Sequence, residues 1–237
     1  MLILNKGWIA VVAIMLLLTA CNGTREPVPE PQNQVQESPE VSEPGDQVQE
    51  SPEEPQPQED TEPTPTEGQP PTAKESAATV MKALKAGNMS TLAAWAHPEK
   101  GIRFSPYAYV DTGTDLVFTR DELEGLMADS EKRVWRTFPG SGELIEMTYA
   151  EYHKQFVYDA DYIKDAEIAV NEGLGQSTTI NNLNEVYPKD SHDFVEYHIK
   201  GIDPAVEGMD WRSLRLVFEK IGDDHALVGI IHDQWTP

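Results

Sequence analysis

Histidines and carboxylates are the residues of this 237-residue chain whose types could do chemistry. Glu196 and His198 lie two residues apart in an extended stretch, so they share one face of a strand, and His232 lies in the last such stretch. Two histidines and a carboxylate suit a non-haem metal. In a meander, however, the intervening strand separates the outer two by about 9.6 Å, whereas each ligand atom must lie about 2.1 Å from the ion. We therefore expect no metal and no cofactor.

His232 and Asp233 form the next candidate pair, for general acid or base work. Neighbours on a strand point to opposite faces, so Asp233 cannot orient the ring of His232 and another carboxylate would be required. The alternative is a histidine that is hydrogen-bonded at the end of a sheet. The sequence contains no nucleophile elbow, phosphate-binding loop, dinucleotide fingerprint or zinc motif.

Aromatic and polar residues that could line a cavity form a third group. Rings with a few directed polar groups are typical of small-ligand pockets, although rings at strand spacing are also ordinary core. The residues that we expect to contact a ligand are Arg103, Tyr107 and His232. The full set also includes Trp135, Trp211, Arg212 and Trp235.

Cys21 is the one cysteine of the chain. Before it come one positive residue, Lys6, and eleven apolar residues, Trp8–Leu18, which is the layout of an export signal. As a helix, that run would reach only about 17 Å against a bilayer core of about 30 Å, so it is too short for a permanent span. A nucleophilic thiol would need a base and oxyanion donors around it, and a position beside a cleavage site cannot supply them. The alternatives left are an attachment point and a free cysteine after an ordinary cleaved signal.

The four residues Leu18-Thr19-Ala20-Cys21 resemble the lipobox of bacterial lipoproteins, in which the thiol receives a diacylglyceryl group and the signal is cut just before it. The resemblance implies that residues 1–20 are a lipoprotein signal peptide and that Cys21 is the lipid attachment. It implies a protein held on the extracytoplasmic face of a cell membrane. The stretch HPEKGIRFSPYAYVD, residues 97–111, is similar to one in lipoproteins of Gram-positive bacteria, a resemblance that carries no activity with it.

Residues 21–72 have the composition of a tether. From Asn22 to Thr72 the sequence holds 12 of the 18 prolines and 13 acidic residues but no aromatic one. Such a segment cannot bury enough apolar surface to offset its ordering entropy, so we expect disorder with polyproline character. The motif QVQESPE occurs at Gln34–Glu40 and again at Gln47–Glu53, as a local duplication.

Residues 73–237 are long enough for one domain with a sizeable core. From Glu75 onward there are 28 acidic residues against 15 Lys and Arg, a difference of −13, so nucleic acid is excluded as a partner. An acidic surface of this kind favours solubility or the binding of cationic wall components. Disulfides play no part, because the one thiol belongs to the anchor.

Local signals predict both helices and strands in this part. Three capping boxes mark helix starts, at Thr72–Glu75, Thr119–Glu122 and Thr148–Glu151, and a short helix is predicted over residues 90–96. Strands are predicted at Phe194–Lys200, Ser213–Ile221 and Ala226–Trp235, the last two joined by a hairpin at Gly222-Asp223-Asp224, and alternation also appears in GIRFSPYAYV and EKRVWRTF.

Helices first and an antiparallel meander last predict an α+β fold with N-terminal helices packed on a curved antiparallel sheet. The closing stretch LRLVFEKIGDDHALVGIIHDQW resembles NTF2-like (SnoaL-like) domains, whose bent sheet often encloses a pocket. The favoured function is non-catalytic binding of a small molecule or envelope component. The alternatives are a SnoaL-like enzyme that uses His232, and an interaction module or homodimer with an exposed apolar sheet face.

Overall fold

The computed structural model describes residues 69–175 and 177–237. Cys21, the signal peptide and the tether predicted for residues 21–72 lie, except for residues 69–72, outside the described residues. Every described residue belongs to one compact unit of the chain. Within the described ranges no helix has both the length and the hydropathy needed to cross a bilayer.

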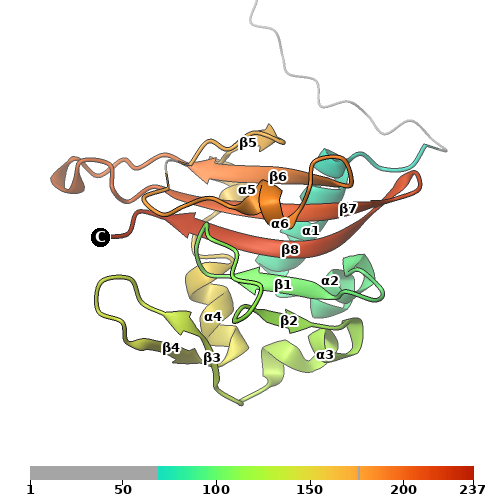
Figure 1. Cartoon of the computed structure of the whole chain (residues 1–237), viewed down its shortest axis with the longest axis horizontal. Helices are drawn as coiled ribbons and strands as arrows, with labels where there is room; N and C mark the ends of the chain where they lie inside the picture. The colour runs from blue at the N-terminus through green and yellow to red at the C-terminus, as the bar shows by residue number, and fades with distance from the viewer. Residues whose placement is uncertain (1–68, 176) are drawn as a thin grey trace, which may run out of the picture. The chain divides into compact units, whose positions relative to one another are not determined.

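A six-stranded sheet with the order β2-β1-β8-β7-β6-β5 forms the centre of the described part (Figure 1). Its strands are β1 (Ile102–Ser105), β2 (Leu116–Phe118), β5 (Glu167–Val170), β6 (His192–Ile199), β7 (Arg212–Ile221) and β8 (Asp224–Gln234). A separate hairpin consists of β3 (Arg133–Thr137) and β4 (Leu144–Met147). The meander β6-β7-β8 is antiparallel, as predicted, and a register shift lies between Val217 and Phe218 of β7.

Most of the helices pack on one face of the sheet, and the last α-helix lies on the other (Figure 1). The α-helices are α1 (Ala73–Ala86), α2 (Met89–Trp95), α3 (Arg120–Gly125), α4 (Tyr149–Phe156), α5 (Tyr162–Asp165) and α6 (Leu183–Val186), and two 3₁₀ turns are η1 (Leu126–Ala128) and η2 (Pro204–Val206). All three predicted capping boxes are present, with Thr72, Thr119 and Thr148 as the N-caps of α1, α3 and α4. The first helix ends at Ala86 and is capped by Gly87, whose left-handed φ of 61° suits a residue without a side chain.

Aromatic rings fill the space between the helices and the sheet. Trp135 of the β3–β4 hairpin stacks on Tyr152 of α4 with 3.7 Å between ring centroids, and Phe104 of β1 meets both rings edge to face. These side chains are buried in one hydrophobic cluster with the apolar residues of α1. The cavity that the NTF2-like resemblance implied is therefore occupied here by packed rings.

The opposite face of the sheet, called the outer face below, is also covered. Alternation along β7 sends Leu214 and Leu216 to the helices and Ser213, Arg215 and Val217 to the outer face. A covering segment, residues 171–175 and 177–190 with α6, lies over this face; Figure 1 shows α6 in front of the sheet and α1 behind it. Leu183 and Tyr187 of this segment pack in a second, smaller hydrophobic cluster.

The α+β class and the helices-then-sheet order are confirmed, but the sheet is not wholly antiparallel. β1 pairs with β8 in parallel, through Arg103–Gly229 and Phe104–Ile230. The sequence-based expectation of an antiparallel sheet is corrected at this one pair. The reason is physical: parallel neighbours need a long crossover connection, and the chain between β1 and β8 is more than a hundred residues long and includes helices.

Candidate functional site

A buried ionic cluster lies on the outer face at the centre of the meander. Arg215 of β7 donates from Nε and Nη2 to the carboxylate of Glu196 on β6, at 3.1 and 3.2 Å, and from Nη2 to Asp233 of β8 at 2.8 Å. The side chains of Arg215 and Glu196 are 0% exposed and that of Asp233 is 2% exposed. Strand register brings the first pair together, because Glu196 and Arg215 are direct cross-strand partners.

The cluster ties the covering segment to the sheet. The backbone N–H groups of Leu174 and Gly175 donate to the two oxygens of Glu196, at 3.0 and 2.9 Å, and Ser177 donates to Asp233. Gly175 has no room for a side chain, since a Cβ there would lie 2.8 Å from Ser213 Oγ and 3.1 Å from the Trp211 ring. The segment is therefore held against the strands by charge-assisted hydrogen bonds and by close backbone approach.

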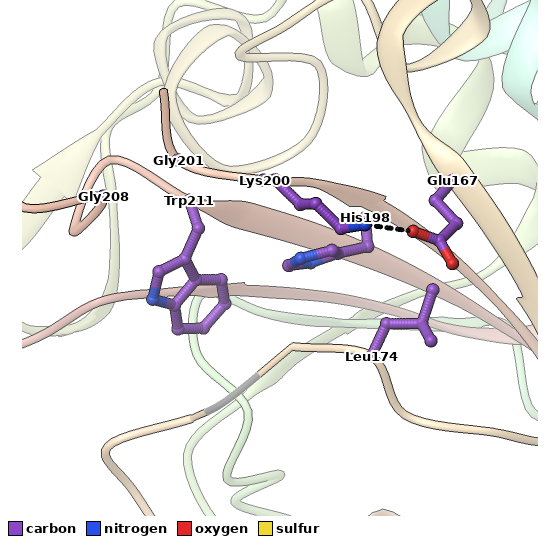
Figure 2. Close-up of a pocket in the computed structure, with 7 residues that line it drawn as sticks. All are labelled: Glu167, Leu174, His198, Lys200, Gly201, Gly208 and Trp211. Atoms are coloured by element: carbon purple, nitrogen blue, oxygen red, sulfur yellow. Dashed lines mark ion pairs between the residues drawn. The ribbon is translucent and has the colours of Figure 1, made fainter. Parts of the chain in front are cut away.

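Beside this cluster is a pocket of about 420 Å³, the Trp211 pocket. Its lining residues are Glu167, Leu174, His198, Lys200, Gly201, Gly208 and Trp211. Figure 2 shows the indole of Trp211 and the imidazole of His198 side by side in the lining of the pocket. Their ring centroids are 5.9 Å apart, and Lys200 Nζ pairs with Glu167 Oε2 at 2.9 Å on the rim.

A braced loop between β6 and β7 forms one wall of the pocket. A Cβ on Gly201 would lie 1.9 Å from the carbonyl oxygen of Gly208, so two glycines allow the ends of the loop to touch. The carboxylate of Asp210 accepts from the N–H groups of Ile202 and Asp203. The wall is thus pre-organised, which reduces the entropy that a ligand would have to remove on binding.

Hydrogen bonding fixes the protonation of His198. The Ser213 hydroxyl donates to Glu196, so it must accept from His198 Nδ1, which lies 2.8 Å from Ser213 Oγ. Burial lowers the pKa of His198, more than the nearby carboxylate of Glu196 raises it, so the ring is neutral at pH 7. Its Nε2, which has no partner among the described residues, is then an acceptor that faces the pocket.

This order of contacts does not support nucleophilic catalysis. In a catalytic triad the histidine lies between the carboxylate and the serine and takes the serine proton. Here Ser213 lies between Glu196 and His198, is fully buried, and gives its proton to the carboxylate. The arrangement holds a ring in place and presents a hydrogen-bond acceptor.

His232 lies on the helix face, away from this site. Its Nε2 is 3.3 Å from Oδ2 of Asp159, and that carboxylate also accepts from Arg212 and Tyr162. Burial raises the pKa of Asp159, but the hydrogen bonds and charges of His232, Tyr162 and Arg212 outweigh it and lower the pKa below its usual value. Asp233 points to the other face, as strand alternation predicts, and Asp159 supplies the carboxylate that the sequence analysis required but did not locate.

The three residues expected to contact one ligand are not brought together. Tyr107 and His232 both pack edge to face against Phe156 on the helix face, with centroids 5.9 and 5.7 Å from it. Arg103 lies on the outer face, in register with Gly229. His232 is fully buried and lines neither the Trp211 pocket nor the pockets around Trp95 and around Arg103. No group of three metal-ligating side chains occurs within residues 69–175 and 177–237.

Sequence reasoning included Trp211 among the cavity residues but missed the rest of the Trp211 pocket. Arg215 lies in the stretch SLRLVF, which the sequence predicts as an ordinary strand, so it was not predicted as a site residue. One signal was available: Ser213 and Arg215 fall on one face of that strand and Glu196 and His198 on one face of its neighbour. Two polar pairs at alternate positions of adjacent buried strands indicate a polar network between them.

Comparisons with known proteins give structural similarity only. No family profile matches the chain, and no curated protein matches it either. Among solved structures, a putative calcium/calmodulin-dependent protein kinase type II association domain from Thiobacillus denitrificans is 9% identical, with a TM-score of 0.34, over 72% of this chain and 100% of that one.

Two further structures are similar to the same extent. An NTF-2 like protein of unknown function from Shewanella oneidensis is 11% identical, with a TM-score of 0.30, over 68% of this chain and 95% of that one. A putative polyketide cyclase from Pseudomonas putida is 11% identical, with a TM-score of 0.29, over 68% of this chain and 90% of that one. TM-scores below 0.5 carry no activity or ligand to this chain.

Replacing Arg215 tests the ionic cluster. We expect Arg215→Met to lower the free energy of unfolding at pH 7 by about 3–5 kcal/mol, because two buried carboxylates lose their counter-charge. In the wild type, burial raises the pKa of Glu196, but Arg215 and the hydrogen bonds lower it below its usual value. That contribution is present above about pH 4.3 and is lost as the pH falls through the folded-state pKa.

In the variant the charge of Arg215 is lost, while the hydrogen bonds from Leu174, Gly175 and Ser213 to Glu196 remain. The folded-state pKa of Glu196 therefore rises relative to the wild type, and its protonated form is favoured. The difference in the free energy of unfolding between the wild type and Arg215→Met should therefore shrink as the pH falls from 7 to 4, as measured by urea unfolding at each pH. Arg215→Lys, which keeps the charge but not the two-pronged geometry, should lose less. A deficit that is the same at pH 4 and pH 7 would contradict this account.

Proposed function

We propose that this is a lipid-anchored extracytoplasmic protein whose domain binds a hydroxyl-rich ring molecule of the cell envelope, such as a wall sugar, in the Trp211 pocket, without chemistry on it. The observation that carries the proposal is the pairing of a flat indole with an imidazole in the lining of one pocket, where Nδ1 of His198 is taken up by Ser213 and Nε2 is left as an acceptor. Indole faces cover the apolar side of a sugar ring, while acceptors and charges take its hydroxyl groups.

The rim of the pocket suits the same ligand class. Glu167 supplies a carboxylate that can accept from a hydroxyl, and Lys200 supplies an ammonium that can donate to one. Both are exposed and paired with each other, so their charges already balance before a ligand arrives. A neutral, polar ligand therefore fits the site better than a strongly charged one.

The position of the pocket supports an outward orientation. The carbonyl oxygen of Pro71 contacts His225 near the start of β8, so the domain begins at the β7–β8 hairpin. Trp211 precedes β7 at the other end of the strands. Ten strand residues span about 34 Å, so a domain anchored through Cys21 would carry the Trp211 pocket on the end away from its attachment.

The enzyme alternative has one observation in its favour, the contact between His232 and Asp159. A general acid or base must reach its substrate, however, and this histidine is fully buried beneath packed rings. The interaction-module alternative called for an exposed apolar sheet face, whereas helices cover one face and the covering segment lies on the other. Ile168 and Val170 are exposed on the edge strand β5, where a second copy of the chain could pack, so a homodimer is a separate proposal.

Tryptophan fluorescence and calorimetry test the ligand proposal with tetra-N-acetylchitotetraose as the probe. We expect saturable binding that Trp211→Ala weakens by about ten-fold or more, since loss of stacking costs roughly 1.4 kcal/mol. His198→Phe, which keeps a ring but removes the acceptor, should weaken binding as well. The matched control is Trp95→Ala, in a different pocket. Equal losses in the Trp211 and Trp95 variants, or no binding by the wild type, would refute the proposal.

Fractionation tests the anchor. Cys21→Ala should abolish metabolic labelling with a tagged fatty acid and release the protein from the membrane fraction, because no other thiol can receive the lipid. The substitution lies far outside the domain, so thermal unfolding of the domain should be unchanged. Membrane retention equal to that of the wild type would contradict the assignment of Cys21.

A further inference from the structure

A second pocket of about 420 Å³ lies on the same outer face, toward the β1–β2 edge of the sheet. Its lining residues are Lys100, Arg103, Val117, Val186, Tyr187, His192 and Val228. Register explains its shape: Val117, Arg103 and Gly229 form one row across β2, β1 and β8. We call it the Arg103 pocket.

Glycine at position 229 allows the ring of Tyr187 to cross the sheet at this point. A Cβ on Gly229 would lie 3.1 Å from the Tyr187 hydroxyl and 3.4 Å from the adjacent ring carbon. Burial raises the pKa of Tyr187 to about 12, and the nearby guanidinium of Arg103 opposes this rise. The neighbour of the guanidinium on this side is thus a buried phenol and not a carboxylate.

Arg103 has no carboxylate partner among the described residues. Its Nη1 donates to the backbone carbonyls of Asp115, at 3.2 Å, and of Thr112, at 3.5 Å. The side chain of Asp115 is already engaged by Ser105 and Arg136. By contrast, Arg133, Arg136, Arg212 and Arg215 each pair with at least one carboxylate. A partly buried guanidinium without a counter-ion is a binding site for an anion.

The neighbouring groups add to this positive charge. Lys100 Nζ pairs with Glu219 Oε2 at 2.5 Å, and the same oxygen lies 3.8 Å from His192 Nε2 and 3.6 Å from His97 Nε2. This carboxylate therefore faces one permanent cation, Lys100, and two imidazoles. Arg103 adds a second cation to the pocket lining, which leaves a local charge of about +1 with neutral imidazoles. The chain as a whole has a net charge of −23, so the sign of the charge in this pocket is opposite to that of the protein's overall charge.

Three valines make up the remaining lining. Val117 is 40% exposed at the edge strand, whereas Val228 is buried. An inorganic ion would leave this apolar surface in contact with water, but an anion with an apolar body would cover it. From the unpaired guanidinium and these valines together, we propose that the Arg103 pocket binds a small organic anion, with its oxyanion on Arg103 and Lys100 and its apolar body on the valines.

Isothermal titration calorimetry on the full chain tests this site with phenyl phosphate, benzoate, inorganic phosphate and benzyl alcohol. We expect phenyl phosphate or benzoate to bind, inorganic phosphate to bind more weakly, and benzyl alcohol not to bind. Binding of either aromatic anion supports the site and identifies its headgroup. Failure of both to bind, or equal binding of benzyl alcohol, would overturn it.

Variants separate this site from the diffuse field of the protein. Arg103→Met should weaken binding of the anion by about ten-fold or more and Lys100→Met by a few-fold, whereas Lys132→Met, an exposed cation on another part of the surface, should have no effect. Lys100→Met carries the test if Arg103→Met fails to fold. Trp211→Ala should leave anion binding unchanged, so the proposal for the Arg103 pocket is tested independently of the proposal for the Trp211 pocket. Equal losses in the Arg103 and Lys132 variants would refute the proposal.

Discussion

The Arg215 guanidinium, buried between Glu196 and Asp233, is the interaction on which the outer half of the structure depends. Removing three charges from water is costly, and only near-complete hydrogen bonding offsets that cost. Two strands supply Glu196 and Asp233, but the last acceptor positions of Glu196 are filled by the backbone of Leu174 and Gly175. The covering segment is therefore required by the charge cluster, and its position in turn shapes the Trp211 pocket.

The two faces of the sheet consequently have different characters. On the helix face, burial is apolar and aromatic, and the stacked pair of Trp135 and Tyr152 occupies the centre. On the outer face, a polar network lies between an apolar patch around Val217 and the Trp211 pocket. The Trp211 pocket and the Arg103 pocket both lie on the outer face, so the ligand chemistry that we propose belongs there and not inside the ring-filled helix side.

Local chemistry made much of the fold predictable from the sequence. The three capping boxes each need only a threonine and a glutamate three residues later, and all three helices begin there. The C-terminal meander was predictable for the same reason, because β7 and β8 are joined by a short turn and both are rich in β-branched and aromatic residues. In each case, the information lies within a few residues of the element.

Long-range partners were not predictable in this way. The parallel pairing of β1 with β8 joins residues more than a hundred positions apart, and it decides that Arg103 faces away from His232. Asp159, which contacts His232, comes from a segment 73 residues earlier. Strand alternation did predict correctly that Asp233 could not serve His232, because that argument needs only the geometry of one strand.

Hydrogen exchange at Leu174 and Gly175 tests most directly whether the ionic cluster holds the outer-face cover. In Glu196→Gln, we expect the amides of these two residues to exchange about ten-fold faster or more, while amides at the centre of β7 stay protected. Glu167→Gln, which alters an exposed carboxylate in the lining of the Trp211 pocket, should leave the exchange of both sets of amides unchanged. Unchanged protection of Leu174 and Gly175 in Glu196→Gln, or an equal acceleration throughout the sheet, would contradict this account.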